Sequence, residues 1–223
     1  MDLSNYTFFL FDFDGLLVNT EHLHFKAYQE MCKGRGIILN WDMETYAGHA
    51  LFHATAVKDA MYAEFPELKE MAPWETLYQE KKEKYLSLLE SESLSLMPGV
   101  ELLLNKVATL KAKSCVVTHS PFEQVKWISQ KLPILKTIPY WITREDYKEP
   151  KPHPDAYLTA LIKFGNDKDR AVGFEDSPRG LKALLGANVD AVLVTSLFDD
   201  QQLIKIRADV KKPFSHITNF THI

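Results

Sequence analysis

The sequence contains little cysteine, since Cys32 and Cys115 are the two cysteines among 223 residues. Neither lies in a Cys-Xaa-Xaa-Cys pair or at the spacing of metal ligands, which argues against a disulfide framework and against a zinc site. We expect both to be buried free thiols in a reducing compartment, and this predicts a cytoplasmic protein.

The chain also lacks an excess of basic residues, because 26 lysines and arginines stand against 30 aspartates and glutamates. The formal net charge is -4 and the pI is near 6.1. Such a protein has no basic surplus with which to neutralise a nucleic-acid backbone, so we expect neither DNA nor RNA as a standing partner.

Long apolar runs are missing as well. The N-terminal stretch carries an acid, Asp2, in place of a basic region, and the apolar run after it extends only from Phe8 to Phe11. This length indicates a buried strand rather than a signal peptide or a membrane span, and we expect no membrane partner. Internal repeats and low-complexity segments are also missing, and we expect a monomer.

What the sequence does contain is a series of short apolar runs separated by segments with helical spacing. Each run has the length of a strand buried on both faces, and the runs are Thr7 to Phe11, Ser114 to Thr118, Ile138 to Ile142, Ala171 to Phe174 and Ala191 to Thr195. Between them, apolar residues recur at helical spacing, as they do from residue 100 to residue 110. The alternation predicts an α/β fold built on a doubly wound parallel sheet.

Residues 19–95 break this alternation, because the segment is long and has helical patterns but no convincing strand. We expect it to be a helical cap domain inserted after the first strand. A Met97-Pro98-Gly99 turn would return the chain to the core domain, which we place at residues 1–18 and 96–223.

Two acids follow the first predicted strand, in Phe11-Asp12-Phe13-Asp14-Gly15. A single aspartate there could simply cap the next turn or helix. A pair of acids, followed by a glycine that allows close backbone approach, favours a metal or phosphoryl site.

A second acidic pair, Glu175 and Asp176, follows the strand that ends at Phe174. If both strands are central neighbours, the acids converge, and unit charges about 4 Å apart repel by about 4 kcal/mol at an effective dielectric of about 20. Such a cluster needs a cation, and with oxygen donors alone the hard ion Mg²⁺ fits best. The alternative, in which these acids cap a helix starting near Pro178, remains open.

Two further segments complete the candidate site. The second long strand ends in Thr118-His119-Ser120, whose hydroxyls and backbone N–H groups could hold an anion, although Ser120 could equally cap a helix. Lys151 lies among three prolines in Glu149-Pro150-Lys151-Pro152-His153-Pro154. Most lysines are solvated surface residues, but a proline-flanked lysine beside an acidic cluster could serve as a fixed cation.

Taken in order, these four segments resemble the motifs of the haloacid dehalogenase superfamily, in its branch of small phosphatases and phosphomutases of the β-phosphoglucomutase type. The resemblance extends over nearly the whole chain and implies a Rossmann-like core with an inserted helical cap. It also implies a phosphoric monoester hydrolase that acts on a small phosphorylated metabolite, such as a sugar phosphate or a nucleotide, with Mg²⁺ as cofactor.

The resemblance assigns roles to the motif residues. It implies that Asp12 is the nucleophile that forms an aspartyl-phosphate and that Asp14 is the general acid and base. It implies that Thr118 and Lys151 bind the transferring phosphoryl group. The implied metal ligands are Asp12, the backbone carbonyl of Asp14, and Asp176. Glu175 is implied either to bind the metal directly or to support the residues that bind it. Dehalogenases of the superfamily lack the second acid of the first motif, so Asp14 argues for phosphate chemistry.

Substrate specificity in this branch is implied to depend on the cap and on the residues near the second motif. The implied substrate-binding residues are Thr20, His24, Gly48, His49, His119 and Ser120. Asn19 departs from the usual aspartate, and His119 from the usual small residue or asparagine.

Two other functions remain open at this stage. His24 occupies the position of a histidine in the β-phosphoglucomutase type, which favours a sugar phosphomutase. The usual mutase arginine after Gly48 is missing, however, and a single histidine can also be structural. A non-catalytic protein that binds a phosphorylated ligand is the third possibility, and it predicts loss of at least one of the four core residues.

Overall fold

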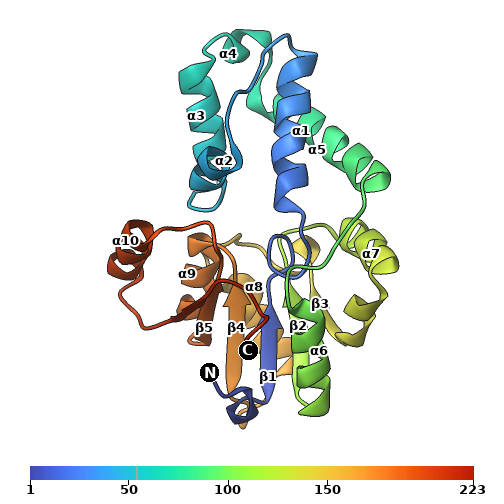
Figure 1. Cartoon of the computed structure of the whole chain (residues 1–223), viewed down its shortest axis with the longest axis vertical. Helices are drawn as coiled ribbons and strands as arrows, with labels where there is room; N and C mark the ends of the chain where they lie inside the picture. The colour runs from blue at the N-terminus through green and yellow to red at the C-terminus, as the bar shows by residue number, and fades with distance from the viewer. Residues whose placement is uncertain (54) are drawn as a thin grey trace. The chain divides into compact units, whose positions relative to one another are not determined.

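The computed structural model describes residues 1–53 and 55–223. These residues form two compact units, one made of residues 1–19 and 95–223 and the other of residues 20–94 (Figure 1). We call the first the α/β unit and the second the helical unit, and describe each by itself. None of the described helices has both the length and the apolar character needed to cross a membrane.

The α/β unit is built on a six-stranded sheet with the order β3-β2-β1-β4-β5-β6, in which every neighbouring pair is parallel. The strands are β1 (Phe8–Phe11), β2 (Lys113–Val117), β3 (Tyr140–Ile142), β4 (Ala171–Glu175), β5 (Asp190–Val194) and β6 (Ser215–Ile217). This is the strand order of doubly wound sheets, so the predicted α/β fold class is confirmed.

Helices follow most of these strands along the chain. They are α6 (Val100–Thr109), α7 (Phe122–Lys131), α8 (Asp155–Phe164), α9 (Pro178–Gly186) and α10 (Asp200–Val210), with short 3-10 turns η1 (Leu3–Asn5), η2 (Pro133–Thr137) and η3 (Arg144–Asp146). All four residues of β1 are buried, as expected of a central strand with apolar side chains on both faces.

The sheet differs from the sequence-based expectation at its two edges. The run Ile138 to Ile142 forms a strand only from Tyr140, because Ile138 closes the η2 turn with an N–H bond to the carbonyl of Leu135 at 3.1 Å. The edge strand β6 was not expected, and its residues are exposed or half-buried, so they carry no apolar run. Edge strands make few core contacts and therefore have a weak sequence signal.

The order of the strands reverses at β1, which pairs with β2 on one side and with β4 on the other. Phe11 is level with Val116 of β2 and with Phe174 of β4. The residues that follow these three positions therefore meet at one edge of the sheet, where open α/β folds bind ligands.

The helical unit contains α1 (Glu21–Gly34), α2 (Met43–Ala50), α3 (Ala56–Glu64), α4 (Leu68–Met71) and α5 (Trp74–Ser91). Its helix α1 packs along α5 (Figure 1). The unit has a hydrophobic core of its own, with Met31, Cys32, Met61, Leu68 and Leu77 among its buried members. Cys115 is buried in the α/β unit, and both cysteines are free thiols, as expected.

The chain leaves the α/β unit and re-enters it at adjacent positions. The Asn19 N–H donates to the carbonyl of Ser95 at 3.0 Å, and the Met97 N–H donates to the carbonyl of Leu17 at 3.0 Å. Between these bonds, Val18 and Leu96 form an antiparallel bridge. The two connecting segments are thus tied together within the α/β unit.

Candidate active site

A buried lysine lies at the centre of the candidate site. Lys151 Nζ is 2.6 Å from Oδ1 of Asp12, 2.7 Å from Oε1 of Glu175 and 2.8 Å from the carbonyl oxygen of Val117. The three ammonium hydrogens are thereby matched to three acceptors, from the ends of β1, β4 and β2. Lys151 is 7% exposed, so the surface-lysine alternative is excluded.

Charge pairing explains why this lysine is stable in the interior. Burial alone would lower the pKa of Lys151, but the charges of Asp12 and Glu175 and their hydrogen bonds raise it well above its usual value. Burial and the charge of Glu175 raise the pKa of Asp12 to about 7, against the opposing effect of Lys151. Once Asp12 and Glu175 are both ionised, they carry two negative charges against the single positive charge of Lys151.

Glu175 is held behind the lysine. Its Oε1 accepts hydrogen bonds from Lys151 and from the Tyr157 hydroxyl, and its side chain is fully buried. Burial, followed by the charges of Glu175 and Asp12, raises the pKa of Tyr157 well above its usual value, so this residue stays a neutral donor. Glu175 thus fixes the lysine with one of its oxygens.

The donor set for a cation consists of oxygens. Asp12, Glu175 and Asp176 are all buried, and each can offer one carboxylate oxygen such that these atoms lie within 4.8 Å of one another. Hard cations such as Mg²⁺ prefer oxygen ligands of this kind, so the residues fit the expected ion. The side chain of Asp14 is not part of this cluster, and the metal-binding role expected for its backbone carbonyl stays a prediction.

Asp14 points to a different partner. Its Oδ2 accepts a hydrogen bond of 2.6 Å from the Ser120 hydroxyl, and Gln124 Nε2 donates to that hydroxyl at 2.9 Å. Gly15 follows with a φ of 75°, a left-handed conformation that glycine adopts without strain, and the chain turns here. The orientation of the Asp14 carboxyl is therefore fixed from the start of α7.

The second motif lies beside this contact. Thr118 is buried, and its hydroxyl accepts a bond of 3.0 Å from the Ser120 N–H while its carbonyl accepts one of 3.1 Å from the Tyr147 hydroxyl. The ring of His119 contacts the same hydroxyl through Nδ1 at 3.0 Å. Partial burial of this ring, and then the charges of Arg179 and Arg144, lower the pKa of His119 to about 4. His119 is a neutral group at neutral pH.

The capping alternatives can now be judged. Helix α9 is capped by Ser177, whose hydroxyl accepts from the Gly180 N–H at 3.2 Å, so Glu175 and Asp176 are not its caps. Helix α7 has Pro121 at its N-cap position and no side-chain cap, so Ser120 is not a cap either. The structure therefore gives none of these three residues the role of a helix cap.

The structure brings together eight of the predicted site residues at the carboxyl edge of the sheet. They are Asp12, Asp14, Thr118, His119, Ser120, Lys151, Glu175 and Asp176, all in the α/β unit. The other four, Thr20, His24, Gly48 and His49, lie in the helical unit, where Thr20 precedes α1 and the pair Gly48-His49 lies in α2. Their predicted substrate-binding role stays a prediction.

His24 has a specific environment within the helical unit. Its Nδ1 is 2.7 Å from Nζ of the buried Lys81, and its ring stacks on that of Tyr85 with centroids 3.9 Å apart. An ammonium group has hydrogens to donate but no lone pair to accept with, so Nδ1 is the acceptor and Nε2 carries the ring hydrogen. The contacts with Lys81 and Tyr85 thus orient the ring, and a charged Lys81 favours the tautomer with its hydrogen on Nε2.

Two residues of these networks escaped the sequence reasoning. Tyr157 fits the apolar spacing of α8, and Lys81 fits the stripe of α5, so both resembled ordinary helix positions. The available signal for Lys81 was a lysine that falls in phase with Leu77 and Tyr85 on the buried face of its helix.

Comparisons with known proteins agree with this geometry. Residues 9–194 match the family described as haloacid dehalogenase-like hydrolase. The chain is 26% identical over 209 residues to the phosphorylated carbohydrates phosphatase of Thermotoga maritima, covering 89% of this chain and 90% of that protein. It is 26% identical over 202 residues to the validoxylamine A 7'-phosphate phosphatase of Streptomyces hygroscopicus subsp. limoneus, covering 90% of each.

Solved structures share the fold. The CbbY protein from Rhodobacter sphaeroides, in complex with phosphate, has a TM-score of 0.73 and 22% identity, covering 97% of this chain and 96% of its own. The β-phosphoglucomutase from Clostridium difficile has a TM-score of 0.74 and 22% identity, covering 98% and 93%. Together with the sequence match, which spans most of the chain, these findings confirm that the protein belongs to the haloacid dehalogenase-like hydrolase family.

Proposed function

We propose that this protein is a magnesium-dependent phosphatase that hydrolyses a small phosphorylated metabolite, in the first place a sugar phosphate, through an aspartyl-phosphate on Asp12. The observation that carries the proposal is the position of Lys151, which contacts both Asp12 and Glu175 beside a buried cluster of three carboxylates. Family relatives named as phosphatases of phosphorylated carbohydrates support the substrate class.

In the first step, a carboxylate oxygen of Asp12 attacks phosphorus, the bond from phosphorus to the ester oxygen breaks, and the Asp14 carboxyl supplies a proton to that oxygen. The products are an aspartyl-phosphate and a free alcohol. Ser120 holds Oδ2 of Asp14 at 2.6 Å, so the orientation of the acid is set before substrate arrives.

In the second step, Asp14 takes a proton from water, the water oxygen attacks phosphorus, and inorganic phosphate leaves Asp12. Lys151 and Thr118 stabilise the charge on the phosphoryl oxygens. Asp12, Asp176 and the backbone carbonyl of Asp14 would hold Mg²⁺, which supplies further positive charge for the transferring group.

Within this proposal, the helical unit serves as the cap that selects the substrate. The ring of His24 is held in one orientation, because Lys81 contacts its Nδ1 and Tyr85 stacks on its face. The same observation favours a second candidate, a sugar phosphomutase, in which an oriented histidine would bind the sugar. Products separate the two, since a hydrolase releases phosphate and a mutase yields an isomeric sugar phosphate.

The test is phosphate release from a panel of sugar phosphates and nucleotides, measured with Mg²⁺ and with a chelator. We expect metal-dependent release that Asp12→Asn abolishes without loss of the fold. The matched control is Asp190→Asn. Asp190 is exposed and begins β5, so it lies at the amino ends of the strands, away from the carboxyl ends where the candidate site lies. Full activity of Asp12→Asn would refute the nucleophile, and isomerisation without phosphate release would favour the mutase.

If all substrates fail in both assays while a phosphorylated ligand still binds, the third candidate, a non-catalytic binding protein, gains support. All four residues that such a protein would be free to lose are present: Asp12, Asp14, Lys151 and Asp176. This observation favours the enzyme.

A further inference from the structure

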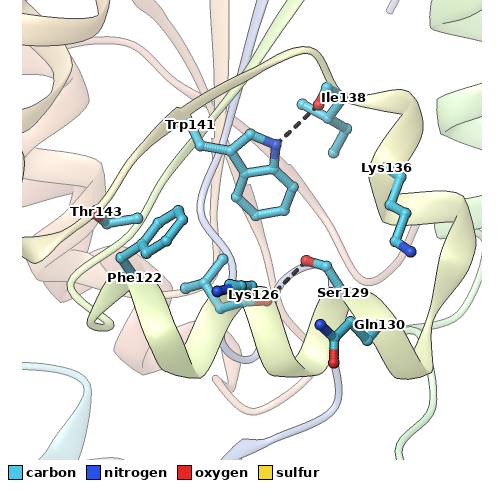
Figure 2. A pocket seen from close by; sticks show the side chains of 9 residues that line it. Phe122, Lys126, Ser129, Gln130, Lys136, Ile138, Trp141 and Thr143 are labelled. Carbon is cyan, nitrogen blue, oxygen red and sulfur yellow. Dashed lines mark hydrogen bonds between the residues drawn. The ribbon is translucent and has the colours of Figure 1, made fainter.

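The α/β unit contains a cavity that the proposed mechanism does not use. It lies between α7 and the segment from η2 to the edge strand β3 and has a volume of about 370 Å³ (Figure 2). This volume is in the range of small-molecule sites, which begins at about 300 Å³. The catalytic carboxylates are not among its lining residues.

The walls of the cavity are apolar and partly aromatic. Phe122 of α7 lies on one side, and Ile138 and Trp141 lie on the other (Figure 2); Val125 also lines the cavity. Phe122 is 51% exposed, an unusual state for a phenylalanine in a folded protein. The Trp141 Nε1–H donates to the carbonyl oxygen of Ile138 at 2.9 Å, so the indole ring is fixed. Two aromatic rings on opposite walls suit a flat apolar ligand.

The polar groups around the cavity carry positive charge or can donate hydrogen bonds. Lys126, Lys136 and Gln130 all line it. Within the described part of the chain, the side chains of Lys136 and Gln130 make no hydrogen bond or ion pair. Lys126 pairs with Glu123 at 3.5 Å, but both side chains are exposed, so this pair is weak and exchangeable. The cavity lining therefore includes two ammonium groups and no carboxylate, and this positive charge suits an anionic ligand.

Two contacts connect the cavity with the acid of the first motif. On one side, α7 carries Gln124, whose side chain reaches Asp14 through the Ser120 hydroxyl at 2.9 and 2.6 Å. On the other side, the Trp141 ring meets the ring of Phe13 edge-on, with centroids 5.8 Å apart. Phe13 lies between Asp12 and Asp14 in the chain. A ligand seated on α7 and Trp141 therefore contacts the helix that carries Gln124 and the ring that packs against Phe13.

We propose that this cavity is an effector site for a small aromatic carboxylate, and that its occupancy is coupled to the positioning of Asp14. The aromatic body lies between Phe122 and Trp141, and the carboxylate contacts Lys136, whereas Lys126 lies over the Phe122 ring and adds positive charge. An occupant stabilises the arrangement in which Ser120 holds Asp14, and so raises kcat/KM. The binding step stands on the cavity alone, whereas the coupling rests on the proposed function.

Binding is tested with 3-phenylpropionate as the probe and 3-phenylpropanamide as its uncharged match. The readout is the indole N–H signal of Trp141 in a two-dimensional NMR titration, identified by its loss in Trp141→Phe. We expect a saturable shift with a Kd of about 1 mM or tighter, and binding of the amide about tenfold weaker. No saturable shift with the carboxylate, or equal affinity for the amide, would overturn the proposal.

The control variants come from neighbouring lysines. Lys136→Met should weaken binding of the carboxylate about tenfold and leave the amide unaffected. Lys131→Met removes the same charge from the end of α7, but its ammonium lies over the ring of Trp127 at 5.1 Å and does not line the cavity. It should leave both affinities unchanged. Equal losses in the two variants would show non-specific attraction and contradict the site.

Coupling is measured separately, on the best phosphate ester found for the wild-type enzyme. Saturating 3-phenylpropionate should raise kcat/KM about fivefold, and Lys136→Met should shift the half-effective concentration in step with its Kd. Binding without any change in kcat/KM, or with a decrease, would overturn the coupling. Failure of the phosphatase proposal itself appears differently, as absence of turnover in the unliganded enzyme while the NMR titration still saturates.

Discussion

Replacement of Gly180 by alanine tests how strongly the candidate site depends on a residue that touches no substrate. Gly180 lies in the first turn of α9, directly against Glu175. A Cβ atom there would be 2.0 Å from both Cδ and Oε2 of Glu175 and 2.2 Å from Oε1. Real Cβ contacts lie beyond 3.0 Å, so the carboxylate or the helix has to move.

The expected size of the effect follows from what this displacement breaks. A shift of about 1 Å takes Glu175 out of reach of Lys151, and disruption of a buried ion pair costs about 3–5 kcal/mol. Alanine regains about 1 kcal/mol of helix propensity, which leaves a net loss of about 2–4 kcal/mol. Because Lys151 also positions Asp12, we expect kcat to fall by about 10²-fold.

The assay is thermal unfolding together with steady-state hydrolysis. For a chain of this size, the expected loss corresponds to a fall in Tm of about 5–15 °C. Gly186→Ala is the matched control, since it lies in the same helix and its Cβ would meet only the Pro154 side chain, at 3.2 Å. If Gly180→Ala matches this control in both Tm and kcat, the reasoning about the carboxylate is wrong.

Three further predictions concern the same networks. Because the pKa of Asp12 is raised to about 7 in the folded protein, protonation of this carboxyl stabilises the metal-free protein. That stabilisation is fully present below the unfolded pKa of about 4 and is lost as the pH rises through about 7. Mg²⁺ binds the deprotonated carboxylate, so the Tm gain from Mg²⁺ should grow between about pH 6 and pH 8, and a pH-independent gain contradicts this. Tyr157→Phe removes a buried donor to Glu175 and should lower the free energy of unfolding by about 2 kcal/mol in chemical denaturation; an unchanged midpoint would exclude a structural role for the hydroxyl. Lys81→Met frees Nδ1 of His24 and should raise KM more than it lowers kcat, whereas an equal loss of both in kinetics would refute a role in ground-state binding.

The parts of the fold that the sequence predicts are those with dense apolar runs. β1 has four buried residues in a row, and the predicted strand at residues 171–174 corresponds to β4 at Ala171–Glu175. Segments of this kind have one stable environment, the interior of a parallel sheet. The edge strand Ser215–Ile217 has no such run and depends on pairing with β5, which no local pattern encodes.

The candidate site shows the same division. Asp12 and Lys151 could be identified because each stands in an unusual local context, two acids at a strand end and a lysine among prolines. Tyr157 and Lys81 could not, because a tyrosine or a lysine on a helix is common and its partner lies elsewhere in the chain. A contact between positions remote in sequence is a property of the fold, and single-residue context does not contain it.

The paired segments that lead out of the α/β unit and back into it make the inserted region topologically replaceable. Asn19 and Ser95 are joined by a backbone hydrogen bond, so the two ends of the insertion are already as close as the ends of a hairpin. A tight turn of a few residues could connect them without altering β1 or α6. Each halving of the connecting length lowers the entropic cost of closing the loop by about 0.6 kcal/mol. The α/β unit of such a shortened chain therefore gains stability from the shorter connection. The same junction can accept insertions of very different length while the carboxylate cluster at the end of the sheet stays unchanged.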